Sequence, residues 1–284
     1  MFKRKNKITK EMVLKVMTSL NQETVKDVIK INLSIDDCSI FTSKFGGLPY
    51  LGKKDLVPVS DNNQQLKLIG QINLEELPKN KYDLDKGILQ FWALDNDLYG
   101  LDFDDMTSQK ESRVIYYPEI DYRVSEAEII EKYLPDKEGY FPIEDTFKLN
   151  FVSSKEGICQ GDYKFDQLFT NKWNHFYPNN LIESYYDLPE EILSEDEFNE
   201  NSGFGHKLFG YPAFTQVDPR SMVSYSQYIL LLQIDGIGVA DKVKTSILFL
   251  YSFICSFALT PNLCSSSIIN KPKFLKLISL LKIL

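Results

Sequence analysis

Histidine and cysteine are scarce in this sequence. The only histidines are His175 and His206, and the four cysteines are widely separated, with no C-x-x-C pair. Scattered cysteines argue against a disulfide framework and against a zinc site, and they are typical of a reducing compartment. Nucleophilic catalysis needs a base beside the nucleophile, so the two histidines leave few places where such chemistry could be built.

The motifs of the common enzyme classes are also missing. There is no G-x-S-x-G elbow, no H-E-x-x-H pair and no Walker loop. The glycines at 203, 205 and 210 are wrongly spaced for a dinucleotide loop, and no βαβ pattern surrounds them. The acidic segment 95–105 fails as an EF-hand because position twelve of that loop would be Met106. We therefore predict no cofactor and no metal.

Basic charge is in deficit. The chain has 40 acidic against 32 basic residues, a formal net charge of -8, and such a chain repels phosphate backbones, so nucleic acid is not an expected partner. The N-terminus is basic, but no apolar run follows it, which argues against a secretory signal. We expect a cytoplasmic protein.

Two related stretches organise the rest of the chain. In the first, a lysine, a Gly-Gly turn and Pro49 precede an apolar strand that carries Gln71. In the second, Lys207 and a Gly-Tyr-Pro turn precede a strand that carries Gln233. The distance from proline to glutamine is 22 positions in the first stretch and 21 in the second. This similarity predicts an internal duplication.

The pattern of apolar residues predicts an α+β fold with mainly antiparallel sheets, N-terminal helices and an atypical C-terminal tail. Residues 8–30 have helical spacing with a polar break at 21–23, and Ser125 with Glu128 forms a capping-box pattern at the start of a second helix. Strands are expected at 31–40, 66–73, 87–94, 113–118, 147–152 and 228–234.

These elements imply a division of the chain into an N-terminal helical segment, a duplicated α+β domain and a tail. The corresponding ranges are 1–30, 31–236 and 237–284. Within the domain the halves are 31–152 and 203–236, linked by 153–202, in which the acidic, aromatic stretch 163–200 is expected to be helix and loop.

The ordered set of motifs resembles the bacterial YwqG family, whose members carry a domain of unknown function. The resemblance covers roughly residues 30 to 236 and is carried by Ser43-Lys-Phe-Gly-Gly-Leu-Pro-Tyr, Leu68-Ile-Gly-Gln-Ile-Asn-Leu, Gly87-Ile-Leu-Gln-Phe-Trp, His206-Lys-Leu-Phe-Gly-Tyr-Pro, Gln216-Val-Asp-Pro and Leu230-Leu-Leu-Gln-Ile-Asp. It implies a compact, soluble α+β protein with an internal duplication, and it brings no activity with it.

The composition changes abruptly near residue 236. From Lys242 to Leu284 the chain has six lysines and no acidic residue, and it departs from the family pattern, which continues with an acidic gap and a Trp-Gly-Asp turn. Our hypothesis is that this tail is read out of frame. The alternative is a membrane contact, in which residues 271–284 form a basic amphipathic helix on an anionic surface. We favour the first, and sequencing the gene across the junction tests it.

The duplication also suggests a site. If the two halves are related by a pseudo-twofold axis, amides, carboxylates and lysines of both motifs would converge on a small polar or anionic ligand. The candidate residues are Lys44, Gln71, Asn73, His206, Lys207, Gln216, Asp218, Gln233 and Asp235. The alternative is structural, with each glutamine bonded to the backbone of its neighbouring glycine turn.

These observations favour a binding or interaction module whose partner is a protein or a small polar ligand. The alternative function is a small-molecule hydrolase in which His206 acts with nearby carboxylates.

Overall fold

A computed structural model describes residues 7–102, 104–105, 108–134, 141, 143, 145–193, 203–214, 218–222, 226 and 228–235. These residues fall into two compact units. The helical unit comprises residues up to Lys30 together with 153–235, and the sheet unit comprises residues 31–152. Residues 1–30 and 153–202, expected to be a separate segment and a linker, thus belong to one unit with 203–235.

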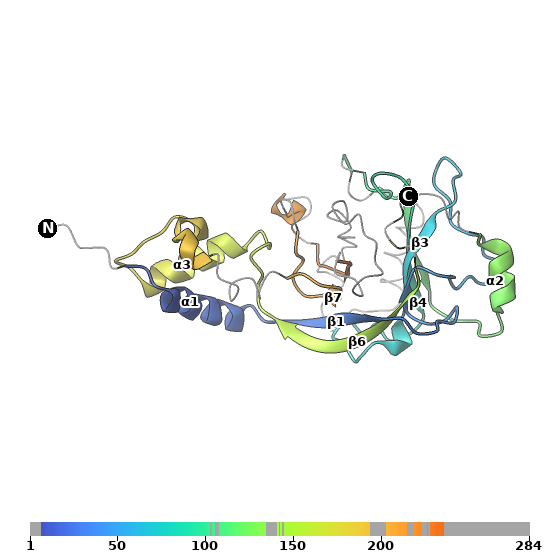
Figure 1. Ribbon diagram of the computed structural model, residues 1–284, viewed down its shortest axis with the longest axis horizontal. Helices are drawn as coiled ribbons and strands as arrows, with labels where there is room; N and C mark the ends of the chain where they lie inside the picture. Colours follow the sequence, from blue (N-terminus) through green and yellow to red (C-terminus); the bar gives the residue numbers. More distant parts are fainter. Residues whose placement is uncertain are drawn as a thin grey trace. The chain divides into compact units, whose positions relative to one another are not determined.

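The helical unit is built on two helices, α1 (Lys10–Glu23) and α3 (Phe165–Phe176), which lie side by side (Figure 1). Their apolar faces share a core in which Val16, Phe169 and Trp173 are fully buried. The segment after α3 contains η2 (Tyr185–Asp187) and α4 (Glu190–Leu193), as the helix-and-loop prediction required. Aromatic side chains such as Phe169 and Trp173 therefore supply much of the apolar area that holds this unit together.

Three strands and a short helical turn complete the helical unit. They are β1 (Lys26–Ser34), of which the residues up to Lys30 belong to this unit, β7 (Lys207–Phe209), η3 (Pro219–Ser221) and β8 (Leu232–Gln233). The strands pair antiparallel in the order β1-β7-β8. The strand expected over 228–234 is reduced to two residues, although the residues from Leu230 to Ile234 are all buried.

The expectation of helix as far as residue 30 is wrong. Helix α1 ends at Glu23, where the Thr24 hydroxyl donates to the Leu20 carbonyl, and β1 begins at Lys26. The apolar positions after the break are mainly β-branched, and they alternate with exposed polar residues from Ile29 onward. Such residues fit a half-buried strand better than a helix, so the polar break marked the end of the helix.

The sheet unit is an antiparallel sheet with the order β5-β4-β3-β2-β6. Its elements are β2 (Lys44–Phe45), β3 (Lys67–Asn73), η1 (Leu74–Glu76), β4 (Ile88–Ala93), β5 (Ser112–Tyr117), α2 (Glu126–Lys132) and β6 (Phe147–Glu156). Strand β6 continues past the residues of this unit, so its last residue, Glu156, belongs to the helical unit.

A hydrophobic core of the sheet unit includes residues of α2 and of the strands. Tyr50, Trp92 and Ile129 are buried in it, and Trp92 meets Tyr133 edge to face. The capping box predicted for Ser125 is confirmed, because its side chain and that of Glu128 bond reciprocally to backbone groups. The antiparallel α+β class is confirmed, whereas the tail 237–284 lies outside the described residues.

Candidate ligand-binding site

Each of the two lysine motifs lies at the centre of a three-stranded arrangement. On β2, Lys44 is opposite Gln71 of β3 on one side and Lys148 of β6 on the other. On β7, Lys207 is opposite Gln233 of β8 and Lys30 of β1. Both lysines therefore have a glutamine on one neighbouring strand and a lysine on the other.

Gln71 is fully buried and is held by the segments on either side of Lys44. Its Oε1 accepts from the Tyr50 N–H at 2.7 Å, and its Nε2 donates to the Ile40 and Thr42 carbonyls at 2.8 and 3.1 Å. Gln90, which the sequence did not single out, adds a bond of 2.8 Å from its Nε2 to the same Oε1. All hydrogen-bonding groups of the Gln71 amide are satisfied inside the protein.

Gln233 repeats this pattern in the helical unit. Its Oε1 accepts from the Ala213 N–H at 3.0 Å, and its Nε2 donates to the Gly203 and Gly205 carbonyls at 3.0 and 2.9 Å. Counted from the lysine, these partners are residues +6, -4 and -2, as they are for Gln71. The structural alternative, in which each glutamine bonds to the turn beside it, thus accounts for both amides.

The turns after the two lysines also match. Residues +2 and +3 have positive φ in both: 63° and 69° at Gly46 and Gly47, and 65° and 75° at Phe209 and Gly210. Residue +2 donates its N–H to the carbonyl two positions before the glutamine in each case, to Ile69 and to Leu231. A left-handed backbone is unfavourable for phenylalanine, so the fully formed network around the turn must hold Phe209 in it.

The residue before each lysine has a common role as well. Ser43 Oγ accepts the Asn73 N–H at 2.8 Å, and His206 Nδ1 accepts the Asp235 N–H at 3.0 Å. Because Nδ1 accepts, a neutral His206 carries its proton on Nε2. In a catalytic triad the reverse holds, since Nδ1–H donates to a carboxylate and Nε2 is the base.

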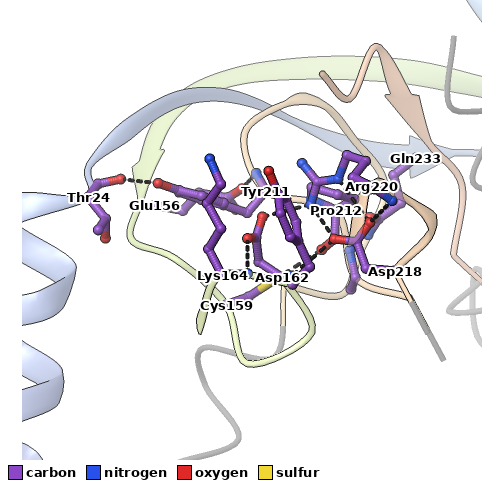
Figure 2. Close-up of polar contacts among 12 residues, drawn as sticks. Thr24, Glu156, Cys159, Asp162, Lys164, Tyr211, Pro212, Asp218, Arg220 and Gln233 are labelled. Carbon is purple, nitrogen blue, oxygen red and sulfur yellow. Dashed lines mark hydrogen bonds and ion pairs between the residues drawn. The ribbon is translucent and has the colours of Figure 1, made fainter. Parts of the chain in front are cut away.

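The two lysines differ in what their ammonium groups contact. Lys207 Nζ donates to both carboxylate oxygens of Glu156 at 3.0 Å, and Glu156 also accepts the Tyr211 N–H (Figure 2). The Tyr211 hydroxyl in turn donates to the Thr24 carbonyl at 2.7 Å. The Glu156 carboxylate therefore joins β6, β7 and the turn after it.

Lys44 has no such partner. Its side chain is 1% exposed, and its ammonium donates to the Ser39 carbonyl at 2.5 Å, without a carboxylate within ion-pair distance among the described residues. Burial lowers the pKa of Lys44 to about 8, although the charges of Cys38, Glu126 and Glu76 act in the opposite direction. Lys44 is thus a buried cation with only part of its donor capacity used.

Asp218 belongs to a second buried network, with two residues that sequence reasoning missed. Arg220 donates to Asp218 Oδ1 and Oδ2 at 3.0 and 2.6 Å, and to Asp162 Oδ2 at 2.7 Å. Asp218 also accepts the Tyr163 N–H, and all three charged side chains are at most 7% exposed. Figure 2 shows how this network ties the segment before α3 to η3.

The candidate residues therefore form two groups, one in each unit. Lys44, Gln71 and Asn73 lie together in the sheet unit. Lys207, Gln233, Asp235, His206 and Asp218 belong to the helical unit, where Asp218 forms part of the arginine network rather than of the lysine motif. Gln216 lies outside the described residues. Convergence of the two groups on one ligand stays a prediction.

The depressed pKa of Lys44 makes a prediction about stability. Between pH 8 and 10.5 the unfolded chain holds a proton on this lysine that the folded chain has lost, so stability rises with pH across that window. Replacing Lys44 by methionine removes the cost of burying the charge. We expect the variant to be more stable than wild type at pH 7, by up to about 3 kcal/mol, with the difference shrinking towards pH 10.

Urea unfolding at a series of pH values measures this difference, with Lys86→Met as the control because the Lys86 side chain is 53% exposed. A Lys44→Met variant that is less stable than wild type at pH 7, or a difference that does not change with pH, contradicts the prediction.

The described residues also offer little for metal binding or for thiol chemistry. They contain no group of three or more His, Cys, Asp or Glu side chains arranged to hold a metal ion. Cys38 and Cys159 are free thiols, and burial raises the pKa of Cys159 to about 11, which makes it a poor nucleophile. Within the same part of the chain, no helix has the length and apolar character needed to cross a membrane.

Comparison with known proteins places the chain in a family. Residues 43–259 match the family described as a domain of unknown function (DUF1963), and this match covers more than half of the sequence. The chain belongs to that family. The matched range begins at the first lysine motif and includes the second. A search of the curated proteins found no match.

Proposed function

We propose that this protein is a binding module rather than an enzyme, and that the lysine motifs are where it takes a small polar ligand. One observation carries the proposal: the Gln71 and Gln233 amides and the His206 ring are hydrogen-bonded to backbone groups, whereas Lys44 is a buried ammonium with a single acceptor among the described residues. Groups committed to backbone are poor catalysts, but a positioned and incompletely bonded cation is suited to binding.

We also propose that the two lysine motifs arose by internal duplication. The support is that their contacts agree at constant offsets: the glutamine partners, the two positive-φ residues and the acceptor before each lysine. Unrelated turns have no reason to share all of these together with the same cross-strand register.

Hydrolysis by His206 is the alternative function, and we rank it below binding. A general base needs a free nitrogen lone pair facing the nucleophile. His206 Nδ1 is occupied by the Asp235 N–H, and the Asp235 carboxylate accepts the N–H of Gly205. Neither group of this pair is arranged as in a triad.

The family resemblance and the cellular compartment are also proposals. We propose that the protein is a bacterial, YwqG-like member of its family and works in the cytoplasm. The ordered motifs support the first part, and the scattered cysteines, of which Cys38 and Cys159 are free thiols, support the second. A protein partner remains the alternative to a small ligand.

Two measurements on the full chain test binding against catalysis. We expect at least one class of small polar compound to raise the melting temperature saturably. We expect no hydrolysis of p-nitrophenyl acetate or p-nitrophenyl phosphate beyond what the His206→Gln variant shows, since glutamine keeps an acceptor for the Asp235 N–H. Turnover by wild type that falls about 100-fold or more in the folded variant would establish His206 as a base and overturn the proposal.

A further inference from the structure

The two lysine motifs differ in what the lysine ammonium contacts, and that difference identifies a class of ligand. In the helical unit, Glu156 occupies a seat made by three features of the motif. The Lys207 ammonium and the Tyr211 N–H donate to the carboxylate, and Gly210 leaves room for it, because a Cβ on Gly210 would lie 2.1 Å from Glu156 Oε1. The seat therefore consists of the lysine, the N–H at +4 and a glycine at +3.

The sheet unit has the same three features without the carboxylate. Lys44, Gly47 and the N–H of Leu48 stand at the equivalent positions. Beside Gly47 lies Thr146, whose Oγ1 would be 2.5 Å from a Cβ added there. By the registers of β2 with β6 and of β7 with β1, Thr146 corresponds to Val28, and no described residue of the sheet unit supplies a carboxylate in the place of Glu156. Within the described part of the chain, Lys44 Nζ bonds only to the Ser39 carbonyl, and the Leu48 N–H has no protein acceptor.

We propose that Lys44, the Leu48 N–H and Thr146 form a binding site for the carboxylate group of a small molecule. The ligand carboxylate takes the place that Glu156 takes in the helical unit, accepting from the ammonium and from the backbone N–H. This inference rests on the proposed function, and it adds the class of ligand and the motif that binds it.

The surroundings allow such a ligand to enter and to be held. Gly47, Leu48 and Thr146 are half-buried, so this side of the motif reaches solvent. The Lys44 ammonium bonds to the carbonyl of the exposed residue Ser39, and among the described residues this is the one hydrogen bond that it must exchange for the carboxylate. An ion pair with two oxygens is a stronger partner for an ammonium than one neutral carbonyl.

The charges that face Lys44 come from several elements. Cys38 lies in the loop before β2, and Glu76 and Glu126 belong to η1 and α2. Lys148 lies opposite Lys44 on β6. Both glutamates are exposed, so water screens their repulsion of an anion, while Lys148 attracts one. Because Lys44 must be protonated to pair with a carboxylate, affinity should fall as the pH rises through about 8.

The first experiment uses acetate as the probe, on the full chain labelled with 15N-leucine and at constant ionic strength set by chloride. We expect acetate to shift the amide signal of Leu48, assigned with the Leu48→Ile variant, in a saturable manner. Lys44→Met should weaken this response at least tenfold, and it is a fair test because the change is expected to stabilise the fold. A response that persists unchanged in Lys44→Met, or no saturable response in wild type, overturns the site.

The second experiment builds the missing carboxylate into the protein. Thr146→Glu should fill the seat as Glu156 does, raise the melting temperature by about 2–4 °C and abolish the acetate response. Thr146→Gln is the matched control, because it has the same shape without the charge and should do neither. If glutamate and glutamine behave alike, the position is not a carboxylate seat.

The outcomes separate this inference from the proposed function. Loss of turnover on His206→Gln bears only on catalysis and is independent of Lys44. A ligand that stabilises the Lys44→Met variant as well as wild type would leave the binding function standing while removing the carboxylate site. A response to a glutamate-containing peptide, but not to acetate, would overturn the small-molecule ligand in favour of an acidic protein segment.

Discussion

Replacing Arg220 by methionine is expected to lower the free energy of unfolding by about 3–5 kcal/mol. Among the described residues, Arg220 is the cation that pairs with two carboxylates, Asp162 and Asp218, which are themselves 3% and 2% exposed. Burial lowers the pKa of Arg220, but its hydrogen bonds to Asp218 and the charge of Asp162 outweigh this and raise it overall. Without the guanidinium, two like charges would remain buried close together, which costs more than the packing of methionine returns.

Urea unfolding of three variants distinguishes this mechanism from a general loss of packing. Arg113→Met removes an arginine whose partner, Asp61, is 63% exposed, and should cost less than about 1 kcal/mol. Combining Arg220→Met with Asp162→Asn and Asp218→Asn removes the repulsion, so the triple variant should recover a large part of the loss. A single variant within 1 kcal/mol of wild type, or a triple variant less stable than the single one, contradicts this account.

The arginine network also shows where sequence reasoning reaches its limit. The Asp-Pro-Arg segment at 218–220 is visible in the sequence, but Asp162 lies 58 residues away from Arg220. No local pattern joins them, because the pairing depends on how the segment before α3 packs against η3. The same holds for Glu156 and Lys207, 51 residues apart, which meet only because β6 ends beside the turn after β7.

Predictions from short sequence patterns were correct for features that depend only on neighbouring residues. The capping box at Ser125, the strands β3, β4 and β5 and the turns at Gly46 and Gly210 follow from residue types at fixed spacing, and the structure has each of them. The boundary at Lys26 was missed because a run of β-branched residues can continue a helical spacing by chance. Strands β2 and β8 have two residues each, which is too short for any alternation to predict.

The sequence predicted residues of the candidate site, but it did not predict which lysine is paired with a carboxylate. Similar prolines and glutamines at similar distances indicated two equivalent motifs, and the contacts of Gln71 and Gln233 are equivalent. The sequence could not show that one lysine is neutralised and the other is not. That difference depends on the Glu156 carboxylate, which packs against Gly210 and pairs with Lys207, and only the three-dimensional arrangement reveals this contact.

The equivalence of the two glutamines predicts two related losses of stability. Gln71→Leu should cost about 3 kcal/mol or more, because the Tyr50 N–H, the Ile40 and Thr42 carbonyls and Gln90 Nε2 would each lose a partner in a buried region. Leucine has similar volume, so packing changes little and the cost reports the unpaired polar groups. Gln233→Leu should be destabilising for the same reason.

The relative size of the two losses of unfolding free energy is a more stringent test than either loss alone. Among the described residues, Gln233 has no counterpart of the bond from Gln90, so its replacement should cost about 1 kcal/mol less than that of Gln71. Gln22→Leu, on the exposed face of α1, controls for the change of residue type and should stay within about 0.5 kcal/mol of wild type. If Gln71→Leu costs no more than this control, the amide does not hold the motif. If Gln233→Leu costs clearly more than Gln71→Leu, the two networks are not energetic equivalents, and the case for duplication loses its physical basis.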